Sequence, residues 1–490
     1  MKEKIKNTLT DKKIYIFLMI TLIFFGIFQK LEYATDTYCV FVTSTKKYCQ
    51  HFINCGRFIS ALCLAITKVL KFNPTQIYTI SYLLAILVTT VSMYVLYNIL
   101  AKDVKSKLTA FIIAIMIIIN LFSIELYLFL EKGIMMLSVL FCVLAFKHFV
   151  KYLEGNKKEL TATLLYMTLA NFSYQGTVGL FIALSAIYII KQSRTFKQFI
   201  KYNIVAALCY GIPAAIDYAI VKYAFKNSRV SNEVNIVESA KLIWKNTKEM
   251  FIQTFKIIPN YCFAITLGII ILTVIILIIN NKSELKKKFL LLLEISYLIL
   301  AVYIVTIFPQ IMQSTASIGF APRNTYTFAS IIGILMAFIC IEFEQKKFIN
   351  YYIVVISTIF LIIQYTGFLN IERNRYIINY NDWYNAMQIK EKVERYENES
   401  GNKITKVAIY GLETKQASYP ELFTSGDINI KAIDASWSRM DHLKYYLERD
   451  LEEIDPKEEI YDKYYKNKNW KIFDIDQIVL IDDVLHMYTF

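Results

Sequence analysis

Residues 263–279 read FAITLGIIILTVIILII, and this stretch without a charged side chain decides the class of protein. A second stretch of the same kind, FIIAIMIIINLFSI, occupies residues 111–124. The chain of 490 residues is 56% hydrophobic and 19% charged, whereas soluble globular proteins carry about 25% charged residues. Long apolar stretches are typical of helices that cross a lipid bilayer. The composition therefore excludes a soluble enzyme, a nucleic-acid-binding protein and a disordered chain.

Eleven apolar stretches predict an α-helical polytopic membrane protein. Each is near the length needed to cross about 30 Å of hydrocarbon. The lysine-rich residues 1–13 precede the first stretch, and no small-residue cleavage site follows it, so we expect an uncleaved first helix. The predicted spans are residues 14–28, 75–100, 108–130, 133–150, 160–173, 176–190, 203–221, 261–280, 289–308, 325–343 and 348–369.

The charges divide the chain into two parts. Residues 370–490 hold 17 Lys and Arg against 23 Asp and Glu, which leaves 37 against 17 for residues 1–369. Every second connection between the predicted spans is rich in lysine, and such connections stay in the cytoplasm. We therefore expect a multi-pass protein of the cell membrane with a cytoplasmic amino terminus. Residues 1–369 are the predicted transmembrane domain, and residues 370–490 are the predicted extracytoplasmic domain.

The second part has the pattern of a small α/β domain. Residues 406–412, 428–433 and 477–481 are predicted strands, and residues 381–400 and 436–450 are predicted helices. This domain could cover a site or bind an acceptor, or it could only stabilise the last span.

Polar side chains in or beside the apolar stretches are the candidate functional residues, because such groups are costly in a membrane unless they are paired or functional. On the predicted topology they all lie near the outer face. We expect Glu125 inside the third span, two helical turns from Lys132 and on the same face of the helix. The set is Asp36, Arg57, Glu125, Glu131, Lys132, Tyr174, Gln175, Asp217, Gln310, Gln313 and Arg323.

Each of these residues also has a purely structural interpretation. The arginines and Lys132 could anchor lipid headgroups, and Glu125 could simply pair with Lys132. Gln175 could satisfy the end of a helix, and Asp36 could be a solvated surface residue. Asp217 could be a structural partner or a member of the same cluster.

Carboxylates, cations and apolar walls together suit a donor whose sugar is linked to a lipid phosphate. The guanidinium of Arg57 matches phosphate oxygens bidentately. Asp36 is the candidate base that takes the proton of the acceptor hydroxyl. The four histidines are widely scattered and no CxxC pair occurs, so we expect no metal site and no cofactor.

The order of these motifs resembles that of the bacterial GtrII-type glucosyltransferases, polytopic membrane enzymes of the GT-C class. The shared features are an amino-terminal span, an outer acidic motif at Asp36, a GR pair at Gly56–Arg57 that opens a helix, and a YQ pair at Tyr174–Gln175. The resemblance implies a GT-C-like membrane domain. It also implies a polyprenyl-phosphate-linked glucose as donor and a cell-surface glycan or lipid-linked glycan as acceptor.

The resulting hypothesis is a hexosyltransferase that works by a single displacement with inversion. Asp36 is its predicted catalytic base; Arg57, Lys132 and Arg323 are predicted to bind the donor phosphate. The predicted substrate-binding residues are Glu125, Glu131, Tyr174 and Gln175. The expected partners are the polyprenyl-phosphate-linked sugar, the glycan acceptor and membrane lipid, with no nucleic acid.

Three other classes of protein remain as alternatives. A flippase or transporter of a lipid-linked glycan would need a polar path through the midplane and internal repeats. A glycan polymerase would use a diphosphate-linked donor and would favour a large outer loop rich in arginine. A structural assembly protein would not need Asp36, Arg57 and Glu125 at one face.

Overall fold

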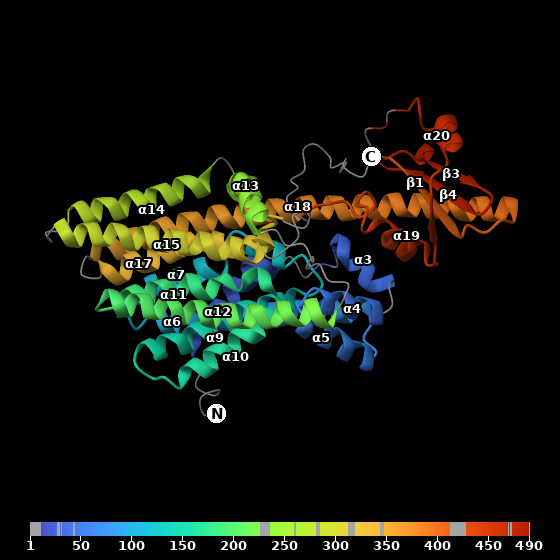
Figure 1. Ribbon diagram of the computed structural model, residues 1–490. Helices are drawn as coiled ribbons and strands as arrows, with labels where there is room; N and C mark the ends of the chain where they lie inside the picture. Colours follow the sequence, from blue (N-terminus) through green and yellow to red (C-terminus); the bar gives the residue numbers. More distant parts are fainter. Residues whose placement is uncertain are drawn as a thin grey trace. The chain divides into compact units, whose positions relative to one another are not determined.

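The computed structural model describes two compact units of mostly helical structure (Figure 1). The first unit comprises Met1–Gln29, Cys49–Tyr127 and Glu131–Leu369, and the second comprises Lys30–Tyr48, Leu128–Leu130 and Asn370–Phe490. The second unit thus includes two short segments that precede residue 370. The described residues are 11–26, 30, 32–42, 45–225, 236–258, 261–280, 285–311, 319–343, 347–411, 428–468, 470 and 473–489.

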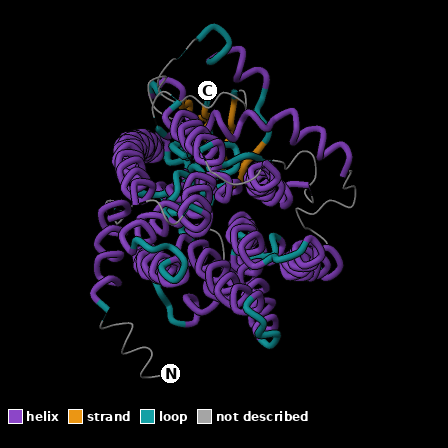
Figure 2. Tube along the Cα trace, turned by 90° about the vertical axis from the view of Figure 1, so that its left-hand side faces the viewer, coloured by secondary structure: helices purple, strands orange, loops and turns teal. Residues whose placement is uncertain are grey.

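Helices dominate the chain up to residue 400. Figure 2 draws all helices in purple and the strands in orange. In order they are α2 (Lys12–Phe25), α3 (Thr35–Val42), α4 (Thr45–Asn54), α5 (Phe58–Val69), α6 (Pro74–Leu100), α7 (Lys107–Ile118), α8 (Ser123–Leu126), α9 (Lys132–Leu153), α10 (Glu159–Ser173), the 3₁₀ turn η2 (Gln175–Thr177), α11 (Gly179–Gln192), α12 (Phe196–Ala224), α13 (Ile236–Ile257), α14 (Cys262–Ile279), α15 (Leu285–Ile311), the 3₁₀ turn η4 (Pro322–Thr325), α16 (Tyr326–Ala329), α17 (Ile331–Glu342) and α18 (Lys347–Ser400).

Eight described helical segments are long and apolar enough to cross a membrane, which indicates a helical membrane protein. The other three predicted spans correspond to the shorter helices α2, α7 and α10. The eight segments are Pro74–Leu100, Lys132–Leu153, Gln175–Gln192, Phe196–Ala224, Cys262–Ile279, Leu285–Ile311, Pro322–Glu342 and Phe348–Ser400.

The prediction of one continuous helix over residues 108–130 is wrong. Helix α7 ends at Ile118, and Asn120 then replaces helical hydrogen bonds with bonds from its own side chain. Its Oδ1 accepts from the Phe122 amide at 2.9 Å, and its Nδ2 donates to Ser330 Oγ at 2.9 Å. Asparagine competes with the helical backbone in this way. Glu125 therefore lies on the separate one-turn helix α8 and does not share a helix with Lys132, which begins α9.

Close packing of α6 against α9 and of α9 against α10 forms one side of the first unit (Figure 1). Helix α6 begins with a capping box, in which Asn73 Oδ1 accepts from the Gln76 amide and Gln76 Oε1 accepts from the Asn73 amide. Such a box satisfies two amides that the helix itself leaves unpaired. At Gly133 a Cβ atom would lie 2.7 Å from the Ser81 carbonyl oxygen, so glycine permits the close approach of α9 to α6.

The second unit contains a four-stranded sheet with the order β2-β1-β4-β3. Strand β1 (Lys406–Tyr410) runs parallel to both β2 (Glu452–Ile454) and β4 (Val484–Tyr488). Strand β3 (Ile478–Ile481) pairs antiparallel with β4. Helix α19 (Arg439–Leu447) connects β1 to β2 along the chain, and α20 (Glu458–Tyr464) and the 3₁₀ turn η5 (Ile475–Gln477) follow β2.

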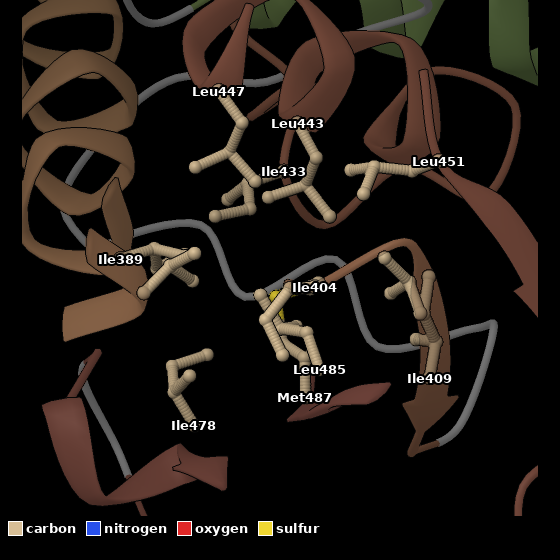
Figure 3. Packing of buried hydrophobic residues seen from close by; sticks show 12 residues of the cluster. Ile389, Ile404, Ile409, Ile433, Leu443, Leu447, Leu451, Ile478, Leu485 and Met487 are labelled. Atoms are coloured by element: carbon tan, nitrogen blue, oxygen red, sulfur yellow. The ribbon is translucent and has the colours of Figure 1, made fainter. Parts of the chain in front are cut away.

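Branched aliphatic side chains from the sheet, from α19 and from α18 make one continuous core in this unit (Figure 3). Ile389 and Val393 come from α18, and Leu443 and Leu447 come from α19. Burial of such side chains is the main favourable contribution to folding. The core residues are Ile389, Val393, Ile404, Val407, Ile409, Ile433, Leu443, Leu447, Leu451, Ile478, Leu485 and Met487.

The strand predictions are right in two places and wrong in one. Strands β1 and β3 lie within the predicted segments 406–412 and 477–481. The predicted helix 381–400 is part of α18, and the predicted helix 436–450 contains the shorter α19. Residues 428–433 do not form a strand, because Asn429 has φ of 60°, a left-handed conformation that starts a turn. The prediction also missed β2 and β4.

Candidate functional site

Three of the predicted site residues, Arg57, Glu131 and Tyr174, meet in the first unit. Arg57 Nη1 lies 3.3 Å from Glu131 Oε1. Its guanidinium carbon lies 4.7 Å from the centre of the Tyr174 ring, which is within the range of a cation–π interaction. Burial favours the neutral form of Arg57, but Tyr174, Cys55 and Glu131 outweigh it and raise the pKa of the guanidinium. Arg57 is therefore a permanent positive charge.

A tight turn places Arg57 at the start of α5. Helix α4 ends at Asn54, and the Arg57 amide donates to the Phe52 carbonyl at 2.9 Å. Gly56 has φ of 73°, a conformation that side chains other than that of glycine disfavour. The GR pair, Gly56–Arg57, thus completes the turn between α4 and α5.

Gln175, the second residue of the YQ pair, is joined to Asp217 on α12. Its Nε2 donates to Asp217 Oδ2 at 2.9 Å and to the Cys55 carbonyl at 3.2 Å. Asp217 is 7% exposed, and its Oδ1 has no hydrogen-bond partner among the residues that the structure describes. Next to Gln175, the Tyr174 hydroxyl donates to Asn324 Oδ1 at 2.9 Å. These bonds connect η2, α12 and η4.

Glu125 and Arg323 form a two-point ion pair. Glu125 Oε1 accepts from Arg323 Nη1 at 2.8 Å, and its Oε2 accepts from the Arg323 backbone amide at 2.6 Å. The Glu125 side chain is fully buried. Charge-assisted pairs of this geometry are strong and directional. The pair therefore fixes η4 and, with it, the neighbouring Asn324.

Lys132 lies at the first position of α9 and is fully buried. Its Nζ is 3.6 Å from the centre of the Tyr78 ring. The aromatic face accounts for the position of the cation by a cation–π interaction.

A cavity of about 310 Å³ opens beside this cluster. Arg57, Tyr174 and Gln175 line it, as does Asp217, whereas Glu125, Glu131, Lys132 and Arg323 are not among its lining residues. We call its polar lining residues the polar wall, and we call the apolar residues of α12 together with Phe308 and Pro309 of α15 the apolar wall. The lining residues are Asn54, Cys55, Arg57, Asn171, Tyr174, Gln175, Gly176, Val178, Tyr210, Gly211, Ala214, Ala215, Asp217, Tyr218, Val221, Phe308, Pro309, Gln310 and Asn324.

The predicted base, Asp36, belongs to the second unit. It lies in the first turn of α3 and is half-buried. Helix α3 packs against α19 through Tyr38, whose ring centre is 4.9 Å from that of His442. The adjacent Thr35 Oγ1 accepts from Trp437 Nε1 at 3.2 Å. That Asp36 faces the same site as Arg57 stays a prediction, and the candidate Gln313 lies outside the described residues.

The sequence interpretation missed two amide side chains of the cavity. Asn171 is 1% exposed and lies three residues before Tyr174, and Asn324 follows the predicted Arg323. Nearness to a candidate residue along the chain was the only available signal for either. Among the described residues, no group of three or more His, Cys, Asp or Glu side chains could hold a metal ion.

The arrangement joins a cation, a carboxylate and amides to apolar walls in one cavity. It can accommodate a molecule with a negatively charged group, hydrogen-bonding groups and an apolar portion. No protein-family model matches this chain, and no curated protein or solved structure matches it.

Proposed function

We propose that this protein is a membrane glycosyltransferase. It transfers a hexose, glucose by the resemblance to the GtrII-type enzymes, from a polyprenyl phosphate to a hydroxyl of a cell-surface or lipid-linked glycan. The observation that carries the proposal is a cavity lined by both kinds of group, with Arg57 and Asp217 among its polar residues and apolar side chains of α12 and α15 among the others.

The apolar wall supports a lipid-linked donor. Helices α12 and α15 are both long and apolar enough to cross a membrane, so a polyprenyl chain could lie along them. A volume of about 310 Å³ is at the lower end of the range for small-molecule pockets. The cavity thus suits the sugar phosphate and the first part of the lipid.

The polar wall supports binding of the phosphate. Arg57 Nε has no hydrogen-bond partner among the described residues, and only Nη1 is held by Glu131. The guanidinium therefore has donors left for phosphate oxygens. In this proposal Arg57 contacts the phosphate directly. Lys132 and Arg323 do not line the cavity, and Arg323 positions η4 through its pair with Glu125.

The reaction is a single displacement at C1 of the hexose. Asp36 takes the proton of the acceptor hydroxyl, and the hydroxyl oxygen forms a bond to C1 from the face opposite the phosphate. The bond between C1 and the phosphate oxygen breaks, and polyprenyl phosphate leaves with the electron pair. Arg57 stabilises the charge that develops on this oxygen. The step inverts the configuration at C1.

The proposal includes the finer topology expected from the charges. Eleven spans, a cytoplasmic amino terminus and an extracytoplasmic second part would present the acceptor side of the enzyme outside the cell membrane. The GT-C-like character of the membrane domain rests on the resemblance. The domain after residue 370 would then act as an acceptor-binding domain or as a cover for the site.

Transfer of labelled sugar tests the proposal. Membranes that contain the protein are incubated with radiolabelled polyprenyl-phosphate glucose and extracted surface glycan, and label in the glycan is measured. Asp36→Asn should lower transfer by about 10²–10⁴-fold at unchanged expression. Asp441→Asn, which removes another acidic residue from the first turn of a helix in the second unit, is the matched control.

Two results would contradict the proposal. Label that crosses the bilayer of sealed vesicles but never enters glycan would identify a flippase. Transfer by Asp36→Asn at the wild-type rate would remove Asp36 as the base.

A further inference from the structure

Asp217 is a buried carboxylate that the displacement does not use. One of its oxygens, Oδ2, accepts from Gln175 Nε2, and the other, Oδ1, has no hydrogen-bond partner among the described residues. The side chain lines the cavity, and the residue is only 7% exposed. A buried polar atom without a partner costs free energy, so a donor from a bound molecule would stabilise this arrangement.

Gln175 fixes the direction in which this carboxylate points. Its Nε2 is held by both the Cys55 carbonyl and Asp217 Oδ2, so the amide connects the turn before α5 to α12. At Gly56 a Cβ atom would lie 2.5 Å from Asp217 Oδ1. The missing side chain of Gly56 therefore leaves room for the unpaired oxygen beside the turn before α5.

The lining of the cavity indicates which kind of group would donate a hydrogen bond to Asp217. The Asp217 carboxylate would repel a phosphate, and Arg57 is already the cation proposed to bind the phosphate. Hydroxyl groups of a bound molecule suit the cavity, because the amide side chains of Asn171 and Asn324 also line it and can form hydrogen bonds with hydroxyls. The aromatic faces of Tyr174 and Tyr210 can pack against the C–H groups of a pyranose ring. Carboxylate, amides and rings together are a set that recognises a sugar.

We infer that Asp217, oriented by Gln175, accepts a hydrogen bond from one hydroxyl of the transferred hexose and so selects the donor sugar. The inference rests on the proposed function for the reaction, but binding of the donor tests it without transfer. A site built to bond a hydroxyl rejects an analogue that lacks it far more strongly than an apolar pocket rejects a change of size. Asp217 is thus a specificity-determining residue and leaves the role of base to Asp36.

The test combines deletion of single hydroxyls with deletion of the carboxylate charge. Polyprenyl-phosphate glucose and its 2-, 3-, 4- and 6-deoxy analogues are offered to the full-length wild type and to Asp217→Asn. Equilibrium binding and kcat/KM are measured for each pair. We expect one deoxy analogue to bind the wild type at least 10-fold more weakly than glucose, and Asp217→Asn to lose most of this difference.

Glu294→Gln is the control, because this carboxyl lies on α15 but does not line the cavity. It should discriminate among the analogues as the wild type does. If Asp217→Asn does not fold, Gln175→Met supplies the second variant, since it keeps a side chain of similar length but releases the carboxylate. It should weaken discrimination at the same hydroxyl.

The outcomes separate the inference from the proposed function. Unchanged discrimination in Asp217→Asn and Gln175→Met overturns the sugar contact even if glucose is transferred. A different result would be that the wild type discriminates among the hydroxyls, that Asp217→Asn loses this discrimination, and that no sugar is transferred. This result would overturn the proposed transferase and support the contact between Asp217 and the sugar. Wild-type protein that binds all five donors equally also overturns the contact.

Discussion

Replacing Gly56 by alanine should lower the proposed sugar transfer through a displacement that the structure allows us to estimate. The new Cβ would lie 2.5 Å from Asp217 Oδ1 and 2.7 Å from Gln175 Nε2, whereas ordinary contacts begin at 3.4 Å. The carboxylate must therefore retreat by about 0.9 Å. A misplacement of about 1 Å costs about 10²-fold in rate when it disturbs the orientation of bound substrate. We expect Gly56→Ala to lower transfer by about this factor.

The backbone adds a penalty that a second glycine measures separately. Gly56 has φ of 73°, and Gly401 has φ of 75° but nothing within 4 Å of its Cβ position. An L-residue in this conformation costs roughly 1–2 kcal/mol. Both variants should lose stability by about this amount, but only Gly56→Ala should also lose transfer.

The assay is the initial rate of sugar transfer per folded protein, with unfolding followed by tryptophan emission. Two results would refute the reasoning. One is transfer by Gly56→Ala within threefold of the wild-type rate. The other is an equal loss of transfer in Gly401→Ala, which would show that the left-handed backbone, and not the contact with Asp217, is responsible.

Two further predictions follow from single side chains. Arg57→Lys keeps the charge but loses the planar fork, so kcat/KM for the donor should fall by about 10-fold or more, measured over a range of donor concentrations; an unchanged value would exclude a bidentate phosphate contact. Burial lowers the pKa of His442 from 6.5 to about 3. As the pH falls, the unfolded chain therefore binds a proton at this histidine before the folded chain does. The free energy of unfolding should then decrease as the pH is lowered from 6.5 to 3, by up to about 1.4 kcal/mol per pH unit. His442→Phe should remove this part of the pH dependence in urea unfolding followed by tryptophan emission, and identical pH profiles for both proteins would contradict the assignment; Asp434, whose pKa burial raises, is common to both.

The class of protein followed from the sequence because apolar stretches act locally. Residues 263–279 cannot be covered by any small soluble fold, and α14 forms there as expected. The polar residues beside such stretches were also visible, since each one is conspicuous in an apolar setting. The break at Asn120 was missed because its side chain bonds to Ser330, which lies between α16 and α17, 210 residues away along the chain.

Only the tertiary structure decided which of these polar residues meet. Glu125 could have paired with Lys132 on a shared helix, but its two oxygens accept from Arg323, 198 residues away. The sequence left Asp217 either a structural partner or a member of the cluster, whereas in the structure it accepts a hydrogen bond from Gln175 and lines the cavity. The physical reason is that composition fixes the cost of burying a charge, whereas the partner that offsets the cost is chosen by helix packing. That packing joins segments whose separation along the chain carries no signal.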